Sequence, residues 1–177
     1  FDDQIVHQII KRGNIAASFD RTEAAADNKD IYRDTGLYRI FPDASFGALA
    51  AWAWAYHRCI DILSSLPMVR ANGIAITGHS RGGKTVLLAG ATDDRIALTN
   101  PNDSGIGGAA LNHVKGDGAE CVDSFFGSGN IFWFGAAFAA HRYRDEQLPY
   151  DQHFLHGLVA PRLLLITDAY EDNGANP

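Results

Sequence analysis

Residues 73–85 read GIAITGHSRGGKT, and this stretch decides the fold class. Gly73–Thr77 is rich in apolar and β-branched residues and predicts a buried strand. Three of the six residues in Gly78–Gly83 are glycine, which predicts a tight turn, and Lys84–Ala91 predicts a helix. A strand that passes through a turn directly into a helix is the building unit of α/β proteins.

The flanking sequence continues this alternation of strands and helices. Ser45 is a suitable N-cap for a helix that runs to Ser65 and is ended by Pro67. Further helices are predicted over 2–12, 132–143 and 150–158, further strands over 14–19, 95–99 and 162–167, and irregular segments over 20–43 and 100–130. The apolar strands lack period-two alternation, so we expect a mostly parallel sheet with helices on both faces, a three-layer α/β sandwich.

The turn matches two functional patterns at once. Residues 78–82 form G-x-S-x-G, the nucleophile elbow of α/β-hydrolases, in which a sharp turn lifts the Ser80 hydroxyl above the sheet. Residues 78–85 also form G-x-x-x-x-G-K-T, the phosphate-binding loop of nucleotide-binding proteins. Asp168, after the last predicted strand, would suit the Mg²⁺ of a nucleotide. These short patterns alone leave both functions open.

Longer blocks favour the hydrolase. Residues 78–84, GHSRGGK, resemble the G-x-S-R-x-G-K signature of the glucuronoyl esterase family, a group of α/β-hydrolases that act on plant cell-wall material. The resemblance continues through DRIALT at 94–99, SGIGGA at 104–109, WF at 133–134, LPYDQH at 148–153 and LVAPR at 158–162. It covers most of residues 74–177, whereas residues 1–45 match only loosely. The resemblance implies a serine carboxylester hydrolase that cleaves 4-O-methyl-glucuronoyl esters of xylan in lignocellulose, without metal or organic cofactor.

Roles follow for the residues around the turn. Ser80 would attack the ester carbonyl and form an acyl-enzyme once a histidine takes its proton. The backbone N–H of Arg81 is placed to donate to the oxyanion, and the resemblance adds the Arg81 guanidinium to that site. The resemblance also implies that Lys84 hydrogen-bonds sugar hydroxyls of the uronate. Trp133 with Phe134 is either an aromatic wall for the substrate or an interior anchor.

The acid and the base of the triad differ in how well the sequence indicates them. Asp103 follows the predicted strand 95–99, and Asp172 with its neighbour Glu171 follows the strand 162–167. The resemblance favours Asp103, because the block that flanks it matches best, whereas Gly174 stands where relatives usually have a tryptophan. No histidine of this chain is well placed as the base, so we expect the base beyond residue 177.

Composition restricts the remaining possibilities. The 177 residues suit one domain, and the formal charge of −6 with no cluster of Lys and Arg predicts no nucleic-acid partner. No apolar run is long enough to cross a bilayer, so no membrane partner is expected. Residue 1 is Phe and the only Met is Met68, so we expect residues 1–177 to be one partial catalytic domain, truncated at both ends. Cys59 and Cys121 could form a disulfide or remain buried thiols.

Three other functions stay open beside the leading one. They are an acetyl-xylan-type esterase on the same fold, a nucleotide-binding protein that uses residues 78–85, and a catalytically inactive carbohydrate-binding relative. The family resemblance, and nothing else in the sequence, implies a secreted or periplasmic location.

Overall fold

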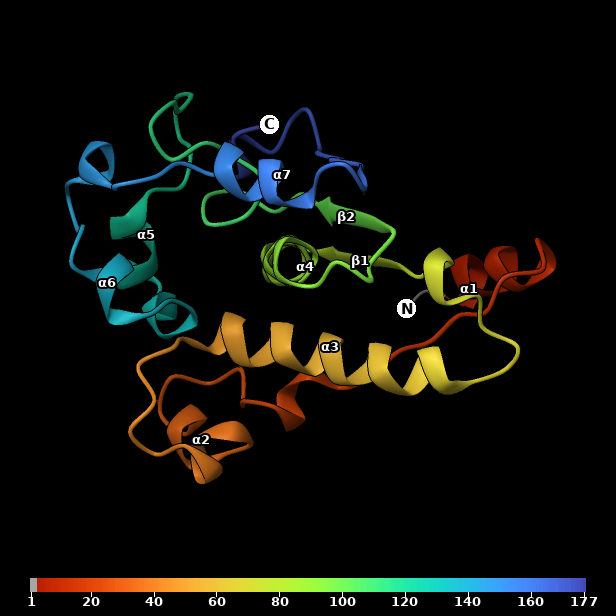
Figure 1. Ribbon diagram of the computed structural model, residues 1–177. Helices are drawn as coiled ribbons and strands as arrows, with labels where there is room; N and C mark the ends of the chain where they lie inside the picture. The colour runs from red at the N-terminus through yellow and green to blue at the C-terminus, as the bar shows by residue number, and fades with distance from the viewer. Residues whose placement is uncertain (1–2) are drawn as a thin grey trace.

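The computed structural model describes residues 3–177, which contain three short parallel strands (Figure 1). The strands are β1 (Ala75–His79), β2 (Leu98–Asn102) and β3 (Leu163–Leu164), in the spatial order β1-β2-β3. After β3 a single bridge joins Thr167 to Asn102, so this segment still follows β2 to its end. The predicted parallel sheet is confirmed, and the carboxyl ends of its strands meet at one edge, where α/β proteins place their sites.

Three helices cover one face of this sheet. Helix α4 (Arg81–Thr92) packs directly on β1 and β2, and both α3 (Ala48–Ser65) and α7 (His153–Val159) pack against α4. In Figure 1, α4 is seen end-on and α3 lies across the view below it. Gly90 permits the close approach of α4 to β2, because a β-carbon there would lie 2.1 Å from Oγ1 of Thr99. The helix that follows the turn is therefore fixed against the sheet over most of its length.

The opposite face of the sheet is open within residues 3–177. Thr77 of β1 is exposed, and Leu163 and Leu165 are 64% and 51% exposed. The sequence predicts burial for residues 162–167, but α4 and α7, the helices with the main contacts to the sheet in the described part of the chain, pack against each other and leave the side chains of Leu163 and Leu165 exposed. Side chains alternate between the two faces of a strand, so covering one face buries only every second residue.

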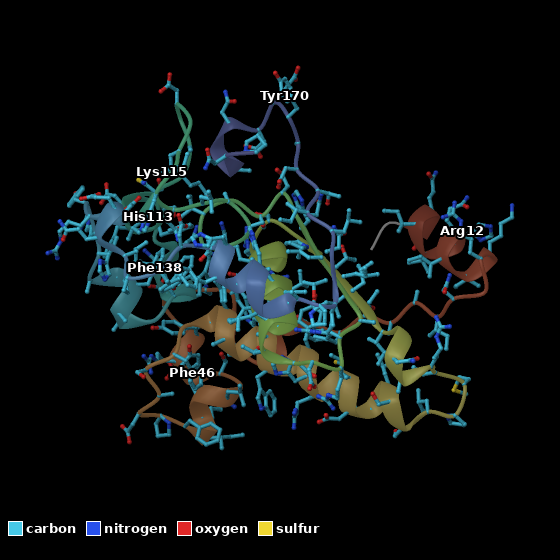
Figure 2. All side chains as sticks on the ribbon, turned by 45° about the horizontal axis from the view of Figure 1, so that its top comes forward. Arg12, Phe46, His113, Lys115, Phe138 and Tyr170 are labelled. Atoms are coloured by element: carbon cyan, nitrogen blue, oxygen red, sulfur yellow. The ribbon has the colours of Figure 1, made fainter. Side chains whose placement is uncertain are left out.

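A second core lies at the end of α3 nearest the turn. Short helices, α2 (Leu37–Ile40), α5 (Val122–Gly127) and α6 (Ala136–Ala139), gather there around Trp52. This core is largely aromatic, with Tyr38, Phe125, Phe132, Trp133 and Phe138 among its buried members. Figure 2 shows Phe138 and Phe46 on the side of the molecule occupied by these short helices. The segments before and after the sheet are thus held together by side-chain packing rather than by further strands.

Several predicted elements differ in the structure. Residues 14–19 belong to no helix or strand and are mostly exposed, so the predicted buried strand is absent there. The helix predicted over 132–143 is replaced by a 3₁₀ turn (Asn130–Trp133) and α6, with Gly135 between them as the N-cap of α6. Helix α3 is capped by Gly47, not by Ser45.

Other sequence predictions are settled by the remaining elements. Helix α1 (Asp3–Lys11) forms as the pattern of 2–12 predicts, although the expected start at Asp2 lies outside the described residues. Both Cys59 and Cys121 are free thiols, so the disulfide is absent from residues 3–177. Among the helices of that range, none is long and apolar enough to cross a membrane.

Candidate active site

Ser80 lies at a strained turn between β1 and α4. Its backbone has φ 55° and ψ −122°, a region that costs a residue with a side chain about 1–3 kcal/mol and is kept where the surroundings enforce it. The Ser80 N–H donates to the carbonyl of Asn102 (3.0 Å), and the Ser80 carbonyl accepts the first helical hydrogen bond from the N–H of Lys84 (3.0 Å). This is the geometry of a nucleophile elbow, in which the turn holds the serine side chain at the carboxyl edge of the sheet.

A hollow of about 100 Å³ opens beside Ser80. Its walls come from the elbow, from the segment after β2, from Glu120 and from the turn at 172–175 after β3. No histidine of residues 3–177 lines this hollow. A larger depression of about 470 Å³ lies along α1, but none of the Gln, Ile, Arg and Asn side chains that line it is a nucleophile or general base. The smaller hollow is therefore the candidate active site.

The structure brings both candidate acids to this hollow. The Asp103 backbone is left-handed (φ 47°), its N–H donates to the carbonyl of Thr167 (2.7 Å), and its Oδ1 accepts from the N–H of Ala169 (3.3 Å). Asp172 caps a 3₁₀ turn, with its Oδ1 accepting from the N–H of Ala175 (3.3 Å). Glu171 is exposed and does not line the hollow.

A third carboxyl group, Asp168, lies close to Asp103. Burial raises the pKa of Asp168 above its usual value, and the neighbouring charge of Asp103 raises it further, while a hydrogen bond from the backbone of Ser104 opposes the rise. The sequence indicates Asp168 only as a magnesium ligand of the nucleotide-binding alternative. Its position directly after a predicted strand is the signal that could have placed it at this edge of the sheet.

Lys84 is buried, with 3% of its surface exposed. Its Nζ donates to the carbonyls of Ser104 (2.8 Å) and Ile106 (2.7 Å) and to Oε2 of Glu120 (3.1 Å). Burial lowers the pKa of Lys84, and the charge of Glu120 partly opposes this. All three ammonium hydrogens therefore have acceptors in the protein. Both residues line the hollow, and Glu120, whose side chain is 37% exposed, is the more accessible member of the pair.

The nucleotide-binding alternative fails on this geometry. A phosphate-binding loop directs backbone N–H groups and its lysine toward one phosphate-sized hollow. Here the lysine of the pattern, Lys84, lines the hollow but its ammonium hydrogens are already donated to two backbone carbonyls and Glu120. Ser80 has the strained conformation of an elbow.

Arg81 extends its guanidinium to a carboxylate far along the chain. Its Nη1 lies 2.8 Å from Oδ2 of Asp27, and its guanidinium carbon lies 4.9 Å from the centre of the Trp133 ring. Trp133 is 5% exposed, belongs to the aromatic core and donates from Nε1 to Oδ1 of Asp27 (3.0 Å). Of the two alternatives for Trp133, this position is that of an interior anchor, and a contact with substrate stays a prediction.

Sequence reasoning missed Glu120 and Asp27. Both lie in segments that the sequence marks only as polar and irregular, 100–130 and 20–43, where no periodic pattern distinguishes one carboxylate from another. Only their contacts with Lys84 and Arg81, two residues of the 78–84 block, distinguish them from the other carboxylates.

Comparison with known proteins agrees with the geometry. The family model for the glucuronyl esterase of fungi matches residues 3–176. A 4-O-methyl-glucuronoyl methylesterase of Schizophyllum commune is 36% identical over 161 residues, which are 86% of this chain and 41% of that protein.

Two solved structures are also similar. A carbohydrate esterase family 15 glucuronoyl esterase from Caldicellulosiruptor kristjansonii has a TM-score of 0.89 and 35% identity, covering 100% of this chain and 52% of that one. A glucuronoyl esterase from Sporotrichum thermophile, in complex with methyl 4-O-methyl-β-D-glucopyranuronate, has a TM-score of 0.77 and 31% identity, covering 87% and 44%. The chain thus spans about half the length of these relatives or less. The predicted α/β-hydrolase fold is confirmed, and the chain belongs to the fungal glucuronyl esterase family.

Proposed function

We propose that the protein is a serine carboxylester hydrolase that cleaves esters of 4-O-methyl-glucuronate through an acyl-enzyme on Ser80. The observation that carries this proposal is the strained Ser80 at a hollow that also holds Asp103 and Asp172. Such a serine, paired with a base and an acid, is the catalytic group of α/β-hydrolases. Two findings support a glucuronoyl ester as the substrate. One relative is a 4-O-methyl-glucuronoyl methylesterase, and a similar structure contains methyl 4-O-methyl-β-D-glucopyranuronate.

The reaction proceeds in two steps. A histidine, which we place in the protein beyond residue 177, takes the Ser80 hydroxyl proton while Oγ attacks the ester carbonyl. The tetrahedral oxyanion accepts hydrogen bonds from the Arg81 backbone N–H and guanidinium, and the alcohol leaves with the proton from the histidine. Water then attacks the acyl-enzyme by the same route and releases the glucuronic acid and Ser80.

The remaining residues of the hollow bind the acyl part and orient the base. Glu120 accepts hydrogen bonds from sugar hydroxyls in this proposal, and its ion pair with the ammonium of Lys84 fixes the carboxylate at the hollow. Asp103 is proposed as the triad acid, with Asp172 as an alternative at the same hollow. In each role the carboxylate would hold the histidine tautomer and stabilise the imidazolium.

Covalent labelling tests the proposal directly. A fluorophosphonate should modify Ser80 in the full-length protein, as peptide mass spectrometry would show, and Ser80→Ala should abolish both labelling and hydrolysis of methyl glucuronate. Ser65→Ala, at the end of α3, is the matched control and should retain both. Hydrolysis by Ser80→Ala at the normal rate would refute the proposal, and faster cleavage of acetylated xylan than of the glucuronate ester would favour the acetyl-xylan alternative.

Two further parts of the proposal have separate tests. Titration calorimetry should detect no binding of Mg-ATP, and micromolar binding that is lost in Lys84→Ala would restore the nucleotide-binding alternative. A secreted or periplasmic location suits an enzyme whose polymeric substrate cannot enter a cell, and fractionation of the producing organism would check it.

A further inference from the structure

Asp27 joins three side chains that come from distant parts of the chain. Its Oδ2 pairs with Nη2 of Arg21 (2.7 Å) and with Nη1 of Arg81 (2.8 Å), while its Oδ1 accepts from Nε1 of Trp133 (3.0 Å). Only 13% of the Asp27 side chain is exposed, compared with 43% for Arg81. The carboxylate is thus the buried, fixed partner, and the arginine beside the nucleophile is the long side chain that it holds.

The segment that carries Asp27 is itself rigidly held. Ala25 is fully buried, and its carbonyl accepts a hydrogen bond from Nε1 of Trp52 on α3 (2.8 Å). The N–H of Ala26 donates to Oγ1 of Thr35 (2.8 Å), which closes the loop behind Asp27. The guanidinium of Arg21 is stacked over the Trp52 ring at 5.0 Å. The position of Asp27 is therefore set by the aromatic core and not by contact with solvent.

The Arg81 guanidinium has donors left over for another acceptor. Nη1 is directed to Asp27, and within residues 3–177 no hydrogen bond of Nε or Nη2 to the protein is formed. Arg81 is the first residue of α4 and directly follows Ser80 in the chain, so its side chain starts from the turn that carries the nucleophile. The planar Arg81 guanidinium is held at Nη1 by Asp27 and stacked over the Trp133 ring, and these two contacts restrict its rotation.

We infer that Asp27 is a positioning residue, which holds the Arg81 guanidinium where it can donate to the oxyanion that forms on attack by Ser80. This inference rests on the function proposed above. An oxyanion donor is effective when it is oriented before the reaction, because no reorganisation is then needed in the transition state. Asp27 supplies that orientation from 54 residues upstream in the chain.

A double-mutant cycle on the full-length enzyme tests the inference. Asp27→Asn keeps the shape of the side chain but removes its charge, and we expect kcat to fall about 10- to 100-fold with KM changed less than about threefold, as for a misplaced catalytic group. Arg81→Ala should lower kcat about 100- to 1,000-fold. Adding Asp27→Asn to Arg81→Ala should then lower kcat less than about twofold further, because the group that Asp27 positions is already gone.

The control and a second variant keep the test decisive. Asp61→Asn removes another carboxylate that pairs with two arginines, at the far end of α3, and should leave kcat unchanged. If Asp27→Asn does not fold by circular dichroism, Trp133→Phe replaces it, since this change removes the indole donor to Asp27 and keeps an aromatic ring in the core. Trp133→Phe should lower kcat in the wild type and not in Arg81→Ala.

The outcomes separate this inference from the proposed function. If the double variant lost kcat by the product of the two single losses, Asp27 would not act through Arg81. If Asp27→Asn changed KM and not kcat, the positioning role would also be wrong. Either result would leave the proposed function standing as long as Ser80→Ala is inactive. Full hydrolysis by Ser80→Ala would overturn the proposed function and the inference with it.

Discussion

The glycines of the elbow should differ sharply in how they tolerate a methyl group. A β-carbon on Gly78 would lie 2.5 Å from the carbonyl oxygen of Gly82, almost an ångström closer than ordinary contact. A β-carbon on Gly83 would lie 2.7 Å from Cβ of Ser104 and 2.8 Å from the carbonyl oxygen of Asn102. At Gly82, in contrast, no atom lies within 4 Å.

The expected free energies follow from these distances. Gly78→Ala and Gly83→Ala must displace backbone or packed atoms, so each should lower the free energy of unfolding by about 1–3 kcal/mol. Gly82→Ala places alanine in the first turn of α4 without a clash and should raise it by about 0.5 kcal/mol, through reduced freedom of the unfolded chain. The pattern G-x-S-x-G includes Gly78 and Gly82 but not Gly83. The structure nevertheless predicts that alanine destabilises the protein more at Gly83 than at Gly82.

Urea unfolding of the three full-length variants, followed by circular dichroism, would measure these changes. Fluorophosphonate labelling of Ser80 in the folded variants would show whether the elbow is intact. A Gly82→Ala variant less stable than Gly78→Ala or Gly83→Ala would refute the reasoning from the elbow geometry.

Three further predictions concern the charged groups of the site and its surroundings. Lys84→Met should lower the free energy of unfolding by about 2 kcal/mol or more in urea titrations, because two buried carbonyls lose their donor; a neutral effect would contradict the hydrogen bonds assigned here. Asp103→Ala should lower kcat on a glucuronate ester more than Asp172→Ala does, with the double variant worse than either, and the reverse order would reassign the acid. Burial raises the pKa of Asp151, but hydrogen bonds from three backbone N–H groups outweigh this and lower it below 3.8. The Asp151 carboxylate therefore contributes to stability above about pH 4, and this contribution is lost as the pH falls through the folded-state pKa. The difference in free energy of unfolding between wild type and Asp151→Asn should shrink from pH 6 to pH 3. A difference that stays constant would contradict the lowered pKa.

The sequence alone determined the elbow, the parallel arrangement and the position of Ser80 at the strained turn. These features depend on contiguous residues: a strand, a turn that needs glycine and a helix follow one another in 73–92, and each is favoured by its own composition. It also placed Asp103 and Asp172 at one edge, since parallel strands bring their carboxyl ends together. The longer sequence blocks also showed the resemblance to glucuronoyl esterases, which the family model confirms.

Tertiary structure alone decided what each charged or aromatic side chain of the site contacts. Lys84 and Arg81 are three residues apart on one short helix, yet Lys84 is buried against Glu120, while Arg81 reaches back to Asp27. The sequence favoured neither carboxylate over the other Asp and Glu residues of their irregular segments. From the sequence, Trp133 suited a substrate wall and an interior anchor equally well. The structure shows that it is buried in the aromatic core around Trp52. Such contacts depend on how segments separated by 36 to 106 residues pack against one another, and this packing has no local pattern in the sequence.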